Sequence, residues 1–292
     1  MRYRSHMNTR DLSRRAFLSL TAAAPFAASA ALKGAPWAMQ SIPVGLELYS
    51  VRGELAKDLL GTVAAVGKMG YQVVEFYSPY MQWTPERARE VRKVLDDSGL
   101  KCPSTHNGAQ SLTPDGLKKA IELNQIIGST NIIIASASAK TADDWKKFAA
   151  QLTQASDQLR PAGMATGFHN HAVEWRPVDG QRPMDVLAAN TPKDVVLQFD
   201  VGTCLEAGAD PIAWINANPG RIKSVHCKDW SPQRGYDVAF GEGAAPWKAL
   251  FAALEKTGGV EYYLVEQETG EKHSDGELGM VRRCLENWKK MK

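Results

Sequence analysis

Eight short apolar runs, each followed by a longer amphipathic run, constrain the fold of this 292-residue chain more than any other feature. Several of the short runs are rich in β-branched residues and show little alternation, as buried parallel strands do. They cover residues 43–49, 71–76, 100–105, 131–135, 165–169, 195–199, 222–226 and 261–265. Strands that alternate with helices in this way predict a (β/α)8 TIM barrel, and a doubly wound open sheet is the alternative.

The amphipathic runs carry the start signals of helices. Pro85 follows Thr84, and Thr141 precedes Asp143 and Asp144, which are typical N-terminal patterns. We expect helices over residues 57–69, 85–98, 116–127, 142–159, 183–189, 211–216, 246–256 and 276–290. The long loop 229–245 follows the seventh strand, so we expect it to lie over the barrel mouth as a lid or substrate wall.

The first thirty residues have the layout of an export signal. A basic start with five arginines leads into a charge-free, alanine-rich stretch over residues 16–32, within which Ala28-Ser29-Ala30 reads as a cleavage site. The segment 13–18 (SRRAFL) resembles a twin-arginine motif. The alternative is a basic amphipathic helix. We expect a signal peptide over 1–30, a linker over 31–41, a catalytic barrel over 42–292 and a periplasmic protein without a stable membrane anchor.

Charge and cysteine content narrow the possible partners. Without residues 1–30 the chain keeps 30 basic and 31 acidic residues, so its near-neutral charge gives no reason to expect nucleic acid as a partner.

No C-x-x-C pair occurs among the four cysteines, and Cys102 and Cys227 lie in apolar runs that predict burial. The sequence leaves disulfides and the oligomeric state open.

Titratable residues end three successive predicted strands. Asp200, His226 and Glu266 follow strands six, seven and eight, and the carboxyl ends of barrel strands converge on one site. Alone, each residue could be a helix cap or a surface charge, but together they indicate a divalent metal. Mixed carboxylate and imidazole ligands suit Mn, Co, Zn or Fe, and we favour Mn.

Other polar and aromatic residues follow the remaining strands. The candidates for substrate contact are Glu47, Glu75, His106, His171, Lys228 and Trp230. Aromatic residues that could stack on a sugar are Tyr49, Phe76, Tyr77, Trp175, Trp230 and Trp247. For any one of them alone we favour ordinary barrel packing, and only the group near the strand ends favours a sugar. Few cations accompany these positions, namely Lys228, Arg52 and Arg234, which favours a substrate without phosphate.

The chain resembles the xylose isomerase-like TIM barrels of the sugar phosphate isomerase/epimerase group over residues 42–290. The resemblance is carried by 45–52 (GLELYSVR), 168–175 (FHNHAVEW), 198–202 (QFDVG), 225–230 (VHCKDW), 241–243 (GEG) and 265–268 (VEQE). It implies a metal held by Glu, Asp, His and Glu from strands five to eight. Asp200, His226 and Glu266 match, whereas His169 stands where the first Glu is expected and becomes the fourth ligand. Glu174 is the substitute for it.

The resemblance implies an isomerase or epimerase that acts on an unphosphorylated sugar or keto-sugar through an enediolate. Glu266, with His169 or Glu174, would transfer the proton, and Lys228 would contact substrate hydroxyls or an oxyanion. The same metal site could serve a keto-glycoside lyase, dehydratase or hydrolase. A sugar-binding barrel without catalysis is a further alternative. Nucleases that share the barrel need more histidines than these strand ends supply.

Overall fold

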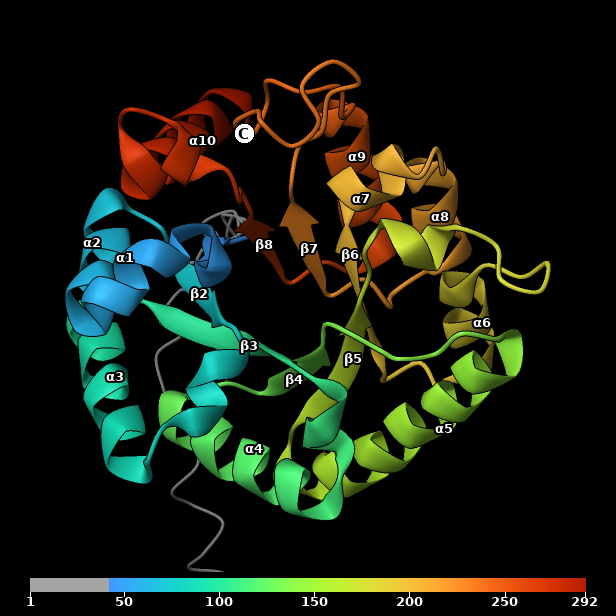
Figure 1. The fold of residues 1–292 in the computed structure, drawn as a ribbon. Coiled ribbons are helices and arrows are strands. Elements are labelled where there is room, and N and C mark those ends of the chain that lie inside the picture. The colour runs from blue at the N-terminus through green and yellow to red at the C-terminus, as the bar shows by residue number, and fades with distance from the viewer. Residues whose placement is uncertain (1–41) are drawn as a thin grey trace, which may run out of the picture. The chain divides into compact units, whose positions relative to one another are not determined.

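The computed structural model describes residues 42–292, which form a closed barrel of eight parallel strands surrounded by helices (Figure 1). Each strand pairs with the next along the chain, and the eighth pairs with the first. The strands are β1(Val44–Glu47), β2(Val73–Phe76), β3(Lys101–Asn107), β4(Asn131–Ile134), β5(Ala165–His169), β6(Val196–Asp200), β7(Ser224–Cys227) and β8(Tyr262–Val265). The barrel prediction is confirmed and the open sheet is excluded. The predicted signal 1–30 and linker 31–41 lie outside the described residues.

The eight predicted helices are all present. They are α2(Leu59–Met69), α3(Pro85–Asp97), α4(Pro114–Ile127), α5(Ala142–Leu159), α6(Pro183–Asn190), α8(Pro211–Ala217), α9(Trp247–Ala253) and α10(Gly276–Met291). Two short helices, α1(Arg52–Lys57) and α7(Val201–Glu206), were not predicted, because six residues are too few to show a helical period. Thr84 and Thr141 cap α3 and α5 with their side chains, as expected.

The main apolar core lies between the strands and the helices, where residues such as Phe168, Phe199 and Leu250 are fully buried. A small separate cluster of Val73, Tyr262 and Leu264 also packs from β2 and β8. Polar residues at other barrel positions, including Ser104, Gln198 and Ser224, are fully buried as well. The barrel interior therefore contains buried polar side chains as well as apolar ones.

The glycines of β1 and β5 allow a close approach between neighbouring strands. A Cβ atom at Gly45 would lie 2.4 Å from the Val73 carbonyl oxygen, and one at Gly167 would lie 2.2 Å from the Val196 carbonyl oxygen. Any other residue at these positions would push the paired strands apart.

All four cysteines are free and buried, which confirms the packing role predicted for Cys102 and Cys227. Burial raises the pKa of each of these thiols, so none is a ready nucleophile. Within residues 42–292, no helix combines the length and the apolar character that crossing a bilayer requires.

Candidate active site

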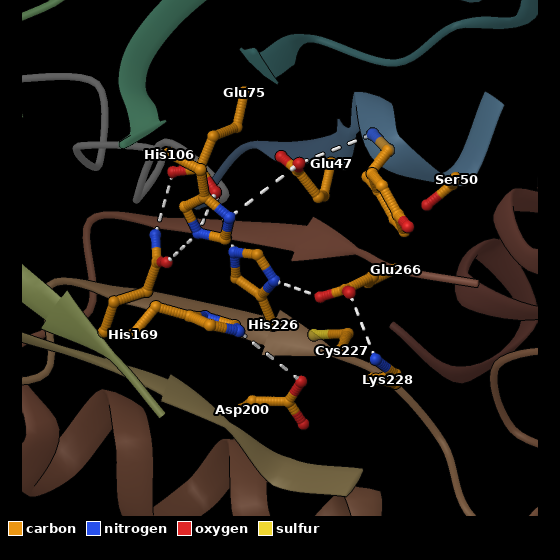
Figure 2. Close-up of polar contacts among 12 residues, drawn as sticks. Glu47, Ser50, Glu75, His106, His169, Asp200, His226, Cys227, Lys228 and Glu266 are labelled. Carbon is orange, nitrogen blue, oxygen red and sulfur yellow. Dashed lines mark hydrogen bonds and ion pairs between the residues drawn. The ribbon is translucent and has the colours of Figure 1, made fainter. Parts of the chain in front are cut away.

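The four predicted metal ligands come together at the carboxyl ends of four adjacent strands. His169 ends β5, Asp200 ends β6, His226 lies in β7 and Glu266 directly follows β8. One ligand atom from each lies within 4.8 Å of the other three, and all four side chains are buried. Figure 2 shows His169 facing Asp200 and His226 facing Glu266. Two ligand atoms that each lie about 2.1 Å from one ion are at most ~4.2 Å apart. The four side chains therefore need to move only slightly closer together to bind an ion.

Two atoms of this cluster lack a hydrogen-bond partner in the described part of the chain. Asp200 accepts a hydrogen bond from the Thr203 backbone at 2.9 Å through Oδ1, while its Oδ2 is buried without a donor. Nδ1 of His169 is buried without a partner as well. Burial raises the pKa of Asp200 to about 6, because a charged carboxylate is unfavourable where water is excluded. Burial, reinforced by the neighbouring histidines, lowers the pKa of His169, which keeps the imidazole neutral as a ligand must be.

His226 is fixed between two carboxylates. Its Nε2 donates to Glu75 at 2.8 Å, and its Nδ1 contacts Glu266 closely. A neutral imidazole with a proton on Nε2 presents a lone pair at Nδ1, so a proton or a cation must lie between Nδ1 and Glu266. This arrangement directs Nδ1 at the other three predicted ligands, and a divalent metal fits the donor set.

Glu75 lies behind the ligands rather than in the cavity wall, where it was predicted to bind substrate. It also accepts hydrogen bonds from Gln198 at 2.9 Å and from Ser104, and it pairs with His106, whose Nε2 lies 2.9 Å away. Burial raises the pKa of Glu75, but the two histidines outweigh burial and hold that pKa below its usual range. The carboxylate therefore stays charged and orients His226, as partners of ligating histidines do.

Gln198 completes this network and was not predicted as a site residue. Its Oε1 accepts from His106 Nε2 at 2.6 Å, and its Nε2 also donates to Ser224 at 3.0 Å. Gln198 stands two residues before Asp200 on β6. Because side chains alternate along a strand, this spacing places both on one face and was a usable signal.

Lys228 joins the ligand cluster to a second acid. Its Nζ donates to Glu266 at 3.1 Å and to Glu268 at 2.7 Å, and it lies 4.9 Å from the ring centre of Tyr236. Burial lowers the pKa of Lys228, but these two glutamates and Asp200 outweigh burial, so the lysine is charged. Burial and the adjacent Glu266 raise the pKa of Glu268 to about 7, which lets Glu268 gain or lose a proton near neutral pH.

The cluster opens into a cavity of about 640 Å³ at the barrel mouth. Predicted site residues that line it are Glu47, His106, His169, His171, Lys228 and Glu266. Its wall also includes Tyr49, Tyr77, Asn107, Thr203, Glu268 and three residues that were not predicted individually, namely Arg176, Glu206 and Tyr236. Arg176 and Glu206, the last residue of α7, are not at strand ends, so the barrel pattern gave no signal for them. Tyr236 belongs to the loop 229–245, which was predicted to form a lid or substrate wall.

Besides Glu75 and the ligands Asp200 and His226, two predicted site residues lie outside the cavity wall, namely Glu174 and Trp230. Glu174 is buried in the 3-10 helix η5(Ala172–Trp175), where its carboxylate accepts from the His171 backbone at 2.7 Å and closes that turn. Burial raises the pKa of Glu174 to about 7. Trp230 lies in the loop after β7, which contributes Tyr236 to the wall instead. Three of the predicted stacking aromatics, Phe76, Trp175 and Trp247, are buried in the core.

Asp229 shapes that loop. Its two carboxylate oxygens accept from the backbones of Trp230, Gly241, Gly243 and Ala245 and from the Trp247 ring nitrogen, at 2.9–3.3 Å. A Cβ atom at Gly243 would lie 2.2 Å from Asp229 Oδ1. These contacts explain the 241–243 segment (GEG) and hold the loop 229–245 in a fixed path.

Comparison with known proteins adds the family context. The family described as xylose isomerase-like TIM barrel matches residues 63–284. An inosose dehydratase from Lacticaseibacillus casei is 28% identical over 146 residues, which are 44% of this chain and 48% of that protein. The chain thus spans about half the length of this relative.

Two solved structures share the fold. A sugar phosphate isomerase/epimerase from Parabacteroides distasonis superposes with a TM-score of 0.71 and 22% identity, covering 86% of this chain and 95% of that one. The IOLI protein, solved with a bound zinc atom, superposes with a TM-score of 0.66 and 15% identity, covering 85% and 97%. The proteins that this chain resembles thus include an inosose dehydratase and, by fold, a sugar phosphate isomerase/epimerase and a protein solved with a bound zinc atom.

Proposed function

Because this chain belongs to the xylose isomerase-like TIM barrel family, we propose that it is a metal-dependent isomerase or epimerase of unphosphorylated sugars or keto-sugars. The observation that carries the proposal is the buried His169–Asp200–His226–Glu266 cluster at the strand ends, with Asp200 Oδ2 lacking a donor within residues 42–292. The substrate carbonyl would lie against this cluster in the cavity.

The four clustered residues would hold one divalent ion, and Mn is our first choice among Mn, Co, Zn and Fe. Such an ion would polarise the carbonyl and its neighbouring hydroxyl and so acidify the proton on the carbon between them. Glu266 removes that proton. The charged Lys228, which lies 3.1 Å from Glu266, stabilises the negative charge that develops on the substrate oxygen. Glu268, with its pKa near 7, exchanges the proton with solvent.

Groups able to carry a proton line two walls of the cavity. His169 and His171 come from the end of β5, while Glu266 and Glu268 follow β8. Burial lowers the pKa of His171 to about 4, so this imidazole is a neutral base at neutral pH. An enediolate bound between the walls can be reprotonated from either face, which is what epimerisation requires.

The charge of the cavity favours a neutral substrate. Four carboxylates line it, Glu47, Glu206, Glu266 and Glu268, against the cations Lys228 and Arg176. Lys228 already pairs with two of the four. A phosphate group would therefore find both cationic side chains of this lining already paired with carboxylates, Arg176 with Glu206 at 4.0 Å. The predicted export signal agrees with a free sugar, and we propose a periplasmic location on that basis.

A second candidate is a lyase or dehydratase that uses the same enolisation step. His169 stands where the family resemblance implies a glutamate, and Glu174 does not line the cavity, which weakens the case for exchange between two carboxylates. Loss of a substituent two carbons from the carbonyl needs one base only. The relative from L. casei is a dehydratase, in keeping with this alternative.

Proton NMR in deuterated water separates the candidates. The protein is stripped with a chelator, reloaded with Mn and incubated with a panel of keto-sugars. Deuterium entering an intact sugar supports the isomerase or epimerase, whereas release of water or an aglycone supports the lyase. Full activity without metal would reject both.

The control is a matched pair of variants. Glu266→Gln should abolish exchange, while Glu261→Gln, which changes an exposed carboxylate just before β8, should not. Unchanged turnover in Glu266→Gln would reject the role assigned to Glu266, whereas binding without any turnover by the wild type would point to a sugar-binding barrel without catalysis.

A further inference from the structure

The exposed large hydrophobic side chains among residues 42–292 are found at one place. Tyr49 is 39% exposed and Val173 is 58% exposed, and both line the cavity above the ligand cluster. Scattered exposed apolar residues need no explanation, but exposed apolar residues that meet at one cavity mark a ligand contact.

The two side chains come from opposite sides of the barrel mouth. Tyr49 follows β1 and Val173 follows β5, and in the closed order β5 is four strands from β1 in either direction. Tyr49 is supported from behind: its ring meets the edge of Tyr77 at 5.2 Å between centres, and the Arg52 guanidinium lies 4.7 Å from its ring centre. These contacts hold the ring at the mouth.

The cavity has room for more than one sugar ring. A hexose has twelve non-hydrogen atoms, and even at the ~30 Å³ that a water molecule occupies in the liquid it would fill about 360 Å³. The cavity measures about 640 Å³. With a sugar at the ligand cluster, about 280 Å³ of the cavity remains, which is enough for a six-membered aromatic ring of about 180 Å³ on the same measure.

We propose that the substrate is a glycoside whose second ring packs between Tyr49 and Val173. This inference rests on the proposed function for the position of the first sugar. A glycosidic bond locks the anomeric carbon as an acetal, so the carbonyl that enolisation needs must be at another ring carbon. The substrate class is therefore a keto-glycoside with a ring-bearing aglycone, and Tyr49 and Val173 determine its specificity.

The test measures binding, so it is independent of turnover. Titration calorimetry on the Mn-loaded protein compares phenyl and methyl glycosides of glucose, galactose, mannose and xylose. We expect at least one phenyl glycoside to bind tenfold or more tightly than its methyl counterpart. In the double variant Tyr49→Ala, Val173→Ser the ratio of the two dissociation constants should fall to about one. In the matched double variant Tyr49→Phe, Val173→Leu it should be kept.

Three results would overturn the proposal: no saturable binding of any phenyl glycoside, equal affinities in the wild type, or an unchanged ratio in the first double variant. Failure of the proposed function looks different. If the protein prefers phenyl glycosides but exchanges no proton, the ring site between Tyr49 and Val173 is supported and the proposed enzyme function is rejected. If the protein exchanges protons in free sugars but shows no ring preference, the enzyme function is supported and the ring site is rejected.

Discussion

Glu75 offers the sharpest test of how the ligand cluster is supported. Its carboxylate contacts His226, His106, Gln198 and Ser104, and it is fully buried. Replacing it by glutamine keeps the shape but exchanges one acceptor oxygen for an NH2 group. That group must face a donor, because each carboxylate oxygen accepts from a neighbour: Oε1 from His226, and Oε2 from Ser104 and Gln198.

The expected cost follows from these contacts. Removing one partner of a buried charged network typically costs about 3–5 kcal/mol of unfolding free energy. Because Glu75 orients His226, we also expect Glu75→Gln to weaken metal binding by roughly 10–100-fold, which corresponds to about 1.4–2.7 kcal/mol. Direct contact with the metal is not needed for this effect.

Two measurements check the prediction. Competition with a fluorescent chelator gives the Mn dissociation constant, and urea unfolding with and without Mn gives the stability. The control is Glu90→Gln, an exposed carboxylate that pairs with Arg87 on α3. A Glu75→Gln variant whose Mn dissociation constant stays within twofold of wild type would refute the supporting role assigned to Glu75.

Three further predictions concern the scaffold. Asp229→Ala removes the acceptor of five N–H groups and should destabilise the loop 229–245 by roughly 3 kcal/mol, with faster limited proteolysis within it; unchanged cleavage would contradict the role of Asp229. Gly45→Ala should cost about 1–3 kcal/mol in chemical unfolding because its Cβ would meet the Val73 carbonyl, and an unchanged midpoint would count against that crowding. Burial raises the pKa of Glu174 to about 7 from 4.5, so the fold favours its protonated form and stability should fall by up to about 3 kcal/mol as pH rises between these values. Glu174→Gln should flatten that part of the pH profile, and a profile identical to wild type would reject this account.

The sequence determined the barrel and most of the candidate ligands. Eight apolar runs separated by helical patterns leave few topologies, and parallel strands bring their carboxyl ends to one rim. Asp200, His226 and Glu266 could therefore be predicted to lie close together, because each stands at the end of a predicted strand. The same reasoning located His106 and Lys228 at the cavity and indicated burial of Cys102 and Cys227.

Only the tertiary structure decided what surrounds these ligands. His169 joins the cluster and Glu174 does not, because the chain turns into η5 after β5 and Glu174 bonds the His171 backbone there. Glu75 and Gln198 meet behind His226 although 123 residues separate them, and Tyr236 reaches the cavity through a loop whose path depends on Asp229. Periodicity specifies which face of a strand a residue occupies. It does not specify how far a side chain reaches or where a loop returns, since these depend on contacts between segments far apart in the sequence.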